Sequence, residues 1–146
     1  MTRQVEVEEV FAVDAATAFQ AYWKLGNWPL ALDSILAVNV EYDDGNHQSF
    51  EMTVQANGGV ENVRGVRFND SGRRLELCQF APPPGFRTMT GAWSFEAVGE
   101  QATRVRAERL FELEDPSREP AVAAMMGGLL SKNLLAFKSL AEAGRS

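Results

Sequence analysis

The order of the periodic segments along this chain constrains its fold more than any other feature. A segment with apolar residues at every second position comes first, and a short helical segment follows. Six more segments of two-residue period come next, and a long amphipathic segment closes the chain. This order predicts an antiparallel sheet packed around the final helix, with an apolar hollow between the layers. Small apolar molecules usually bind in such hollows, so the order favours a ligand-binding protein.

Turn chemistry sets the boundaries of these segments. Gly, Asn and Asp cluster between the apolar stretches, as in an antiparallel meander, and residues 82–85 form a loop because proline has no N–H to donate. The predicted strands cover residues 4–13, 35–42, 48–56, 60–68, 73–81, 86–98 and 103–113. Helices are predicted at residues 15–23, in a short helix or turn from Trp28, and from near Pro120 onward. In the last helix Gly127 and Gly128 predict a kink or a close approach to the sheet.

Composition narrows the functional classes. A length of 146 residues suits one domain with its own core, so residues 1–146 are interpreted as a single domain. The formal net charge of -6 would repel a phosphate backbone, which excludes nucleic acid as a partner. With one cysteine and one histidine, neither a metal nor another cofactor is expected. The chain lacks a signal-peptide pattern and an apolar run of the ~20 residues that a membrane span needs, so we expect a cytoplasmic protein.

The predicted inward faces of three strands each carry an arginine among apolar residues. These are Arg64 in residues 60–68, Arg87 in residues 86–98 and Arg109 in residues 103–113. A guanidinium in an apolar hollow is unfavourable unless it is paired, and its planar fork suits enolates and other anionic oxygens. At least one of the three is therefore expected to bind or polarise a ligand oxygen. The alternative for each is a place at the cavity mouth, or an ion pair with an acid such as Glu51, Glu96 or Glu108.

Apolar and amide side chains complete the candidate site. Those predicted to line the core or cavity are Phe50, Met52, Val54, Trp93, Phe95, Phe111, Leu129 and Phe137. The residues predicted to contact a ligand are Asn62, Gln79, Arg87, Met89, Trp93, Phe95, Arg109, Met126, Leu129 and Asn133. Tyr22 and Tyr42 are phenols that could donate a proton, although tyrosines more often pack as amphipathic side chains. His47 and Cys78 are not favoured as a base or a nucleophile.

Three stretches carry a resemblance to a known family. They are the strand Val63-Arg64-Gly65-Val66-Arg67, the turn Pro83-Pro84-Gly85-Phe86 with the Met-Thr-Gly-Ala-Trp-Ser-Phe strand at residues 89–95, and the Gly-Gly-bearing final helix. Together with the element order, they resemble the START-like, or Bet v 1-like, helix-grip superfamily, and within it the polyketide cyclase and aromatase group. The resemblance implies an α+β helix-grip fold. In this fold a seven-stranded antiparallel sheet wraps around a long C-terminal helix, and two short helices follow the first strand.

The resemblance also implies an activity and a site. Members of that group assist first-ring cyclisation and aromatisation of a poly-β-keto chain held in the cavity. It implies Arg64 as the catalytic arginine that polarises a carbonyl or stabilises an enolate, with Tyr42 as a proton donor. The implied partners are a hydrophobic polyketide-derived molecule and a polyketide synthase or carrier protein. Because the superfamily also contains carriers and sequestering proteins, non-catalytic binding, transport or self-resistance is the alternative, and a cochaperone-like role is a third interpretation.

Overall fold

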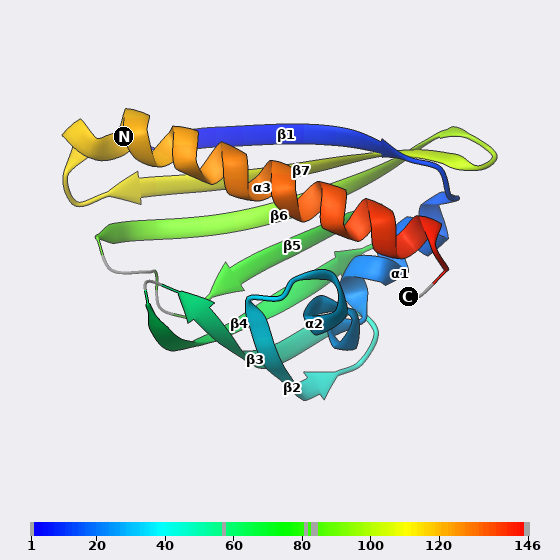
Figure 1. The fold of residues 1–146 in the computed structure, drawn as a ribbon, viewed down its shortest axis with the longest axis horizontal. Coiled ribbons are helices and arrows are strands. Elements are labelled where there is room, and N and C mark those ends of the chain that lie inside the picture. Colours follow the sequence, from blue (N-terminus) through cyan, green and yellow to red (C-terminus); the bar gives the residue numbers. More distant parts are fainter. Residues whose placement is uncertain (1, 57, 81, 83–84, 145–146) are drawn as a thin grey trace.

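Seven antiparallel strands and a long C-terminal helix make up the fold in the computed structural model, which describes residues 2–56, 58–80, 82 and 85–144 (Figure 1). The strands are β1 (Arg3–Phe11), β2 (Ile35–Asp43), β3 (His47–Ala56), β4 (Gly59–Asp70), β5 (Arg74–Gln79), β6 (Phe86–Gly99) and β7 (Ala102–Leu113). The helices are α1 (Ala15–Trp23), α2 (Trp28–Ala31) and α3 (Glu119–Glu142), with 3₁₀ turns at Leu25–Asn27 and Pro116–Arg118. The predicted helix-grip fold is confirmed. The predicted loop at 82–85 includes residues 83 and 84, which lie outside the described residues.

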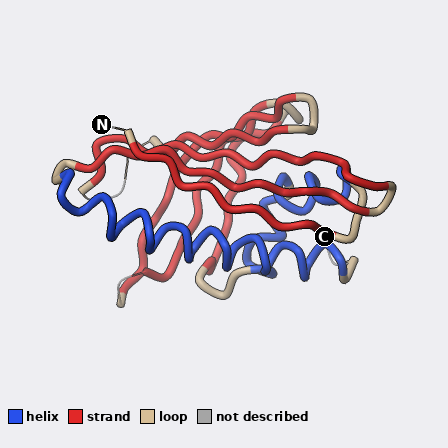
Figure 2. The backbone as a smooth tube through the Cα atoms, turned by 90° about the horizontal axis from the view of Figure 1, so that it is seen from above, coloured by secondary structure: helices blue, strands red, loops and turns tan. Residues whose placement is uncertain are grey.

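The sheet has the strand order β1-β7-β6-β5-β4-β3-β2. The first strand pairs with the last, and the other neighbours are consecutive strands joined by turns. Alternation sets the two faces of each strand. In β7, for example, Val105, Ala107 and Phe111 are buried while Arg106 and Leu110 are exposed. Figure 2 shows the strands curving together, with the helices on one side of the sheet.

The helix α3 runs beside β1 and also touches β7, α1 and α2 (Figures 1 and 2). Its buried residues include Leu130, Leu134 and Phe137. A Cβ atom at residue 127 would lie 3.7 Å from Cγ1 of Val5 on β1, which is an ordinary van der Waals contact, so the packing of α3 against β1 does not require glycine there. By length and apolar composition, residues 116–142 could also cross a membrane. In this structure α3 packs on the sheet through its buried face.

The buried side chains form two groups. The larger one joins α1, α2, the middle of the sheet and the C-terminal half of α3, and it contains Tyr22, Trp93 and Phe137. The smaller one joins β7 to the beginning of α3 and contains Phe111, Leu113 and Met126. Of the predicted core residues, those confirmed as buried are Phe50, Met52, Trp93, Phe95, Phe111 and Phe137. Val54 is partly buried against the larger group.

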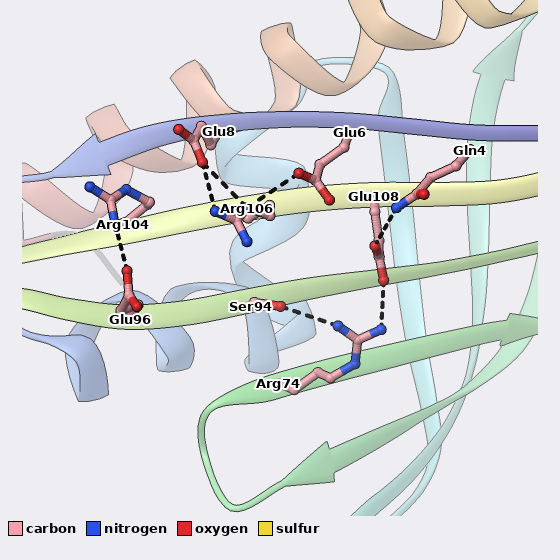
Figure 3. Close-up of polar contacts among 9 residues, drawn as sticks. All are labelled: Gln4, Glu6, Glu8, Arg74, Ser94, Glu96, Arg104, Arg106 and Glu108. Carbon is pink, nitrogen blue, oxygen red and sulfur yellow. Dashed lines mark hydrogen bonds and ion pairs between the residues drawn. The ribbon is translucent and has the colours of Figure 1, made fainter.

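The outer face of the sheet is charged across β1, β7, β6 and β5 (Figure 3). Arg106 pairs with Glu6 at 3.4 Å and with Glu8 at 3.1 Å, and Arg104 pairs with Glu96 at 2.6 Å. Farther along, the Arg74 guanidinium donates to Glu108 at 2.6 Å and to Ser94, while Gln4 donates to the same glutamate. These ion pairs mark this half of the outer face as solvent-facing.

The predicted inward face of β4 is wrong. Val63, Gly65 and the buried Arg67 point inward. The residues that point outward are Val60, Asn62, Arg64, Val66 and Phe68. Arg64 is 52% exposed and pairs with Glu41 at 3.1 Å and Glu51 at 3.8 Å. Asn62 accepts a hydrogen bond from Thr53 on this outer face. The outward side of β4 carries more apolar residues than the inward side, so counting them assigned the wrong face.

The predicted inward position of Arg87 is also wrong. The pairing of β6 with β7 slips between Phe86 and Thr88, so Arg87 occupies a bulge and is turned outward. Its side chain is 63% exposed and lies 3.7 Å from the Glu112 carboxylate. Beyond the bulge, Met89 and Trp93 return to the predicted inward face. A one-residue irregularity therefore separates Arg87 from the face on which the two-residue period placed it.

Candidate functional site: a cavity between the sheet and α3

A cavity of about 990 Å³ lies between the sheet and α3. Strands β5, β6 and β7 form one wall, α3 forms another, and the segment after α2 closes part of the rim. Its size suits a ligand of several fused rings, because small-molecule pockets commonly measure about 300–1,000 Å³. Six of the residues predicted to contact a ligand line this cavity: Gln79, Met89, Arg109, Met126, Leu129 and Asn133.

The rim of the cavity combines exposed apolar and charged residues. Met125 and Leu129 of α3 are 57% and 59% exposed, although both line the cavity. Leu129 is thus a lining residue, as predicted, but it lies near solvent. Apart from Arg109, the charged lining residues are Asp33, Glu61, Glu114, Asp115, Arg118 and Lys132, all of them exposed. The rim is therefore the solvent-exposed end of the cavity.

Arg109 supplies a positive charge to the cavity wall. Its guanidinium lies 4.8 Å from the Trp93 ring centroid, and its Nη1 donates to the carbonyl oxygen of Glu108 at 2.9 Å. Burial lowers the pKa of the Arg109 guanidinium to about 10, so the group remains charged at neutral pH. Within the described part of the chain no carboxylate pairs with it. Among the described residues, the Glu108 carbonyl oxygen is the one hydrogen-bond acceptor that its N–H groups reach.

Gly91 makes room for this arginine. The two residues are directly paired on β6 and β7. A Cβ atom at residue 91 would lie 2.4 Å from Nη1 and 2.8 Å from Cζ of Arg109. The guanidinium therefore occupies the space that any other side chain at this position would fill. Because glycine has no Cβ atom, the Arg109 guanidinium can lie over the Trp93 ring.

An aromatic group packs behind this wall. Tyr22 is fully buried, with its ring 4.1 Å from Phe137 and 5.3 Å from Trp93 between centroids. Its hydroxyl donates to Oδ1 of Asn133 at 3.2 Å. Burial raises the pKa of the Tyr22 phenol well above its ordinary value, so it stays protonated. Trp93 and Phe95, which were predicted to touch the ligand, lie in the core behind the lining residues.

A second buried arginine was missed by the sequence analysis. Arg67 is 2% exposed and donates to Oε1 of Gln48 and to the carbonyl oxygens of Tyr22 and Trp23, at 2.8, 2.8 and 2.6 Å. Burial lowers its pKa to about 9. These bonds tie the last turn of α1 to β3 and β4. Because its donors are engaged by the protein, Arg67 stabilises the fold, whereas Arg109 faces the cavity with donors to spare.

Tyr42, predicted as a proton donor, lies outside the cavity. It is 55% exposed, and its hydroxyl donates to Oδ2 of Asp44 at 2.9 Å. That hydrogen bond raises the pKa of the Tyr42 phenol. With Val66, Phe68 and Leu110, Tyr42 lines a separate hollow of about 560 Å³ on the outer face of the sheet. His47 and Cys78 line the same outer hollow, so neither belongs to the cavity.

Residues 2–142 match the protein family described as "Polyketide cyclase / dehydrase and lipid transport". The chain belongs to this family. Its sequence is 27% identical over 122 residues to the granaticin polyketide synthase bifunctional cyclase/dehydratase of Streptomyces violaceoruber. The match covers 80% of this chain but only 37% of that relative. The chain therefore spans well under half of the curated relative that it matches.

Solved structures show the same fold. The di-domain ARO/CYC BexL superimposes with a TM-score of 0.83 at 20% identity, over 94% of this chain and 45% of that one. A START superfamily protein from Mycobacterium smegmatis superimposes with a TM-score of 0.82 at 16% identity, over 96% and 97% of the two chains. The family match confirms the predicted polyketide cyclase group, and the solved structures confirm the predicted helix-grip fold.

Proposed function

We propose that this protein binds an apolar, oxygen-rich polyketide intermediate in the cavity and assists its cyclisation. The supporting observation is Arg109, a charged group on the cavity wall that has no carboxylate partner among the described residues. Family membership and the cyclase relative support the same chemistry. We also propose that the 146 residues act as one ligand-binding domain, that a polyketide synthase or its carrier protein supplies the ligand, and that the protein works in the cytoplasm.

The proposed role of Arg109 follows from how charge develops during an aldol cyclisation. A methylene between two carbonyls loses a proton to a water molecule, and the negative charge moves onto the enolate oxygen. The enolate carbon then attacks a second carbonyl carbon, whose oxygen takes up the charge and is protonated. Loss of water completes the aromatic ring. A fixed cation beside these oxygens stabilises the charged states more than the neutral substrate. The position of the Arg109 guanidinium over the Trp93 ring, on the cavity wall, supports this role.

A non-catalytic binding protein is the second candidate. The chain's one histidine lies at the outer hollow, and the carboxylates that line the cavity in the described part of the chain are exposed ones. A general base therefore has no evident place beside Arg109. A carrier or sequestering protein would use the same arginine to orient the ligand and would need no base. Product analysis separates these two candidates.

The proposal is tested by substituting the inner arginine and an outer one. Arg109→Met should weaken binding of dihydroxyanthraquinone, followed by quenching of tryptophan fluorescence, by roughly 10- to 100-fold. That range corresponds to ~1.5–3 kcal/mol for hydrogen bonds from a charged donor. Arg64→Met is the matched control, because its guanidinium pairs with Glu41 on the outer face. Equal affinities in wild type and Arg109→Met would refute the proposed site.

Turnover is measured with a poly-β-ketone made in situ by a minimal polyketide synthase. Wild type and Arg64→Met should shift the products toward one ring pattern, and Arg109→Met should leave the spontaneous mixture. Ligand binding by wild type without any change in products would assign the protein to the carrier class instead. That outcome would retain the cavity and Arg109 as the binding site and reject the catalytic role.

A further inference from the structure

Tyr22 and Asn133 make a polar contact in the cavity wall that the proposed role of Arg109 does not use. The Tyr22 hydroxyl lies 3.2 Å from Oδ1 of Asn133. The Tyr22 ring is packed between Phe137 and Trp93, and the residue is 0% exposed. This packing fixes where the hydroxyl can be. Asn133, in contrast, is only half-buried and lines the cavity.

The hydroxyl determines which end of the Asn133 amide faces the ligand. The Tyr22 phenol is protonated, so it has one proton to donate, and a buried O–H group needs an acceptor. Oδ1 of Asn133 is the acceptor that it reaches within the described residues. If the amide were reversed, the phenolic proton would have no such partner. The amide oxygen therefore faces Tyr22, and the amino group is left for the cavity.

We infer that Tyr22 holds Asn133 with its Nδ2 amino group toward the cavity that Arg109 also lines. Asn133 is then a second hydrogen-bond donor, and the two donors together select a β-dicarbonyl unit over a single ketone. In the enol or enolate form of a β-dicarbonyl, two oxygens lie on the same side of a planar unit and share the charge. A cation and a neutral N–H donor match such a pair of acceptors. This inference rests on the proposed function, because a poly-β-ketone is a chain of β-dicarbonyl units.

Tyr22 lies near both donors, Asn133 and Arg109, through the following contacts. Its hydroxyl contacts Asn133, its ring lies against Trp93, and the Arg109 guanidinium lies on that same tryptophan. The charge of Arg109 also acts on the phenol and lowers its pKa, which opposes part of the increase caused by burial. Tyr22 is accordingly a positioning residue. Asn133 is the group expected to touch the ligand.

Two probes that differ by one oxygen test the inference. Benzoylacetone and benzylacetone each carry a phenyl ring and a methyl ketone, and benzoylacetone alone carries a second carbonyl. The measured quantity is the ratio of their dissociation constants, obtained by isothermal titration at neutral pH. Wild type should bind benzoylacetone at least tenfold more tightly. Tyr22→Phe should reduce this preference by about threefold or more, and Asn133→Leu should abolish most of it.

Asn133→Asp is the sharpest variant. A carboxylate at residue 133 still accepts the Tyr22 hydrogen bond, but it offers the cavity an acceptor in place of a donor. The expected result is loss of the preference for benzoylacetone, with a melting temperature close to that of wild type by circular dichroism. Ser131→Ala, on an exposed position of the same helix, is the control and should change neither quantity. The ratio of affinities is informative because a general loosening of the fold would weaken the binding of both probes and leave their ratio unchanged.

The outcomes separate this inference from the proposed function. Unchanged benzoylacetone binding by Arg109→Met refutes the proposed function itself. If Arg109→Met weakens binding while Tyr22→Phe and Asn133→Asp keep the wild-type ratio, the proposed function stands and the positioning of Asn133 is refuted. If Tyr22→Phe does not fold, the ratios of Asn133→Asp and Asn133→Leu decide the question. A lost preference in both supports the inference, and a wild-type ratio in either overturns it.

Discussion

Gly91→Ala should weaken ligand binding while leaving the stability of the fold nearly unchanged. A Cβ atom at this position would lie 2.4 Å from Nη1 of Arg109, whereas non-bonded carbon contacts are normally about 3.5–4.0 Å. The guanidinium must therefore move by roughly 1 Å, away from its position over Trp93. The backbone stays in place, because the tip of the flexible arginine yields. Alanine is also more favourable than glycine within a strand, by about 0.5–1 kcal/mol. This gain offsets the lost contact between Arg109 and Trp93.

The magnitude follows from what Arg109 loses. A cation–π contact contributes about 0.5–2 kcal/mol, and a displaced donor meets the ligand oxygen with poorer geometry. We expect dihydroxyanthraquinone affinity to fall by about 5- to 30-fold, which corresponds to ~1–2 kcal/mol. The free energy of unfolding in urea should stay within about 1 kcal/mol of the wild-type value. Unchanged affinity, or a loss of several kcal/mol of stability, would refute the described geometry of Gly91 and Arg109.

Three further predictions concern groups outside the cavity. Arg67→Met should lower the free energy of unfolding in urea by about 3 kcal/mol or more, because the buried charged donor of three hydrogen bonds is lost. Arg64→Met should change that free energy by less than about 1 kcal/mol, since exposed ion pairs contribute little. Hydrogen bonds from the backbone N–H groups of His47 and Asn46 lower the pKa of Asp44 from 3.8 to about 2. Its stabilising effect is therefore present above pH 3.8 and is lost as the pH falls toward 2. Asp44→Asn should flatten the acid limb of the stability profile measured by urea unfolding.

The fold was predictable because each local signal agreed with the others. Alternating residues and Gly-, Asn- and Asp-rich turns indicated seven strands, and the apolar stripe indicated α3. The face of β4 could have been predicted from the hairpin register. Phe50 was placed inward, and its direct partner across the β3–β4 hairpin is Gly65. Directly paired residues share a face, so Gly65 and Arg67 must point inward with it. Apolar counting failed because Val66 and Phe68 line the outer hollow.

The two-residue period of the strands could not show which arginine faces the cavity and which is paired with a carboxylate. Arg64, Arg87 and Arg109 looked equivalent in the sequence, since each stood among apolar residues. Carboxylates across the sheet pair with Arg64, and a bulge turns Arg87 outward. Only the arrangement of β6, β7 and α3 places Arg109 on the cavity wall without such a partner. The Tyr22 contact with Asn133 joins residues 111 positions apart, and no local pattern reports it.

The ionisation of a bound enol tests most directly the central claim that Arg109 stabilises an enolate oxygen. Benzoylacetone absorbs differently as enol and as enolate, so its ionisation can be followed spectroscopically while it is bound. If Arg109 stabilises an enolate oxygen, wild type should lower the pKa of the bound enol by about 1–3 units relative to the free probe. Arg109→Met should lose most of this shift, and Arg64→Met should retain it. An enol pKa that is the same for the free probe, bound to wild type and bound to Arg109→Met would contradict the account.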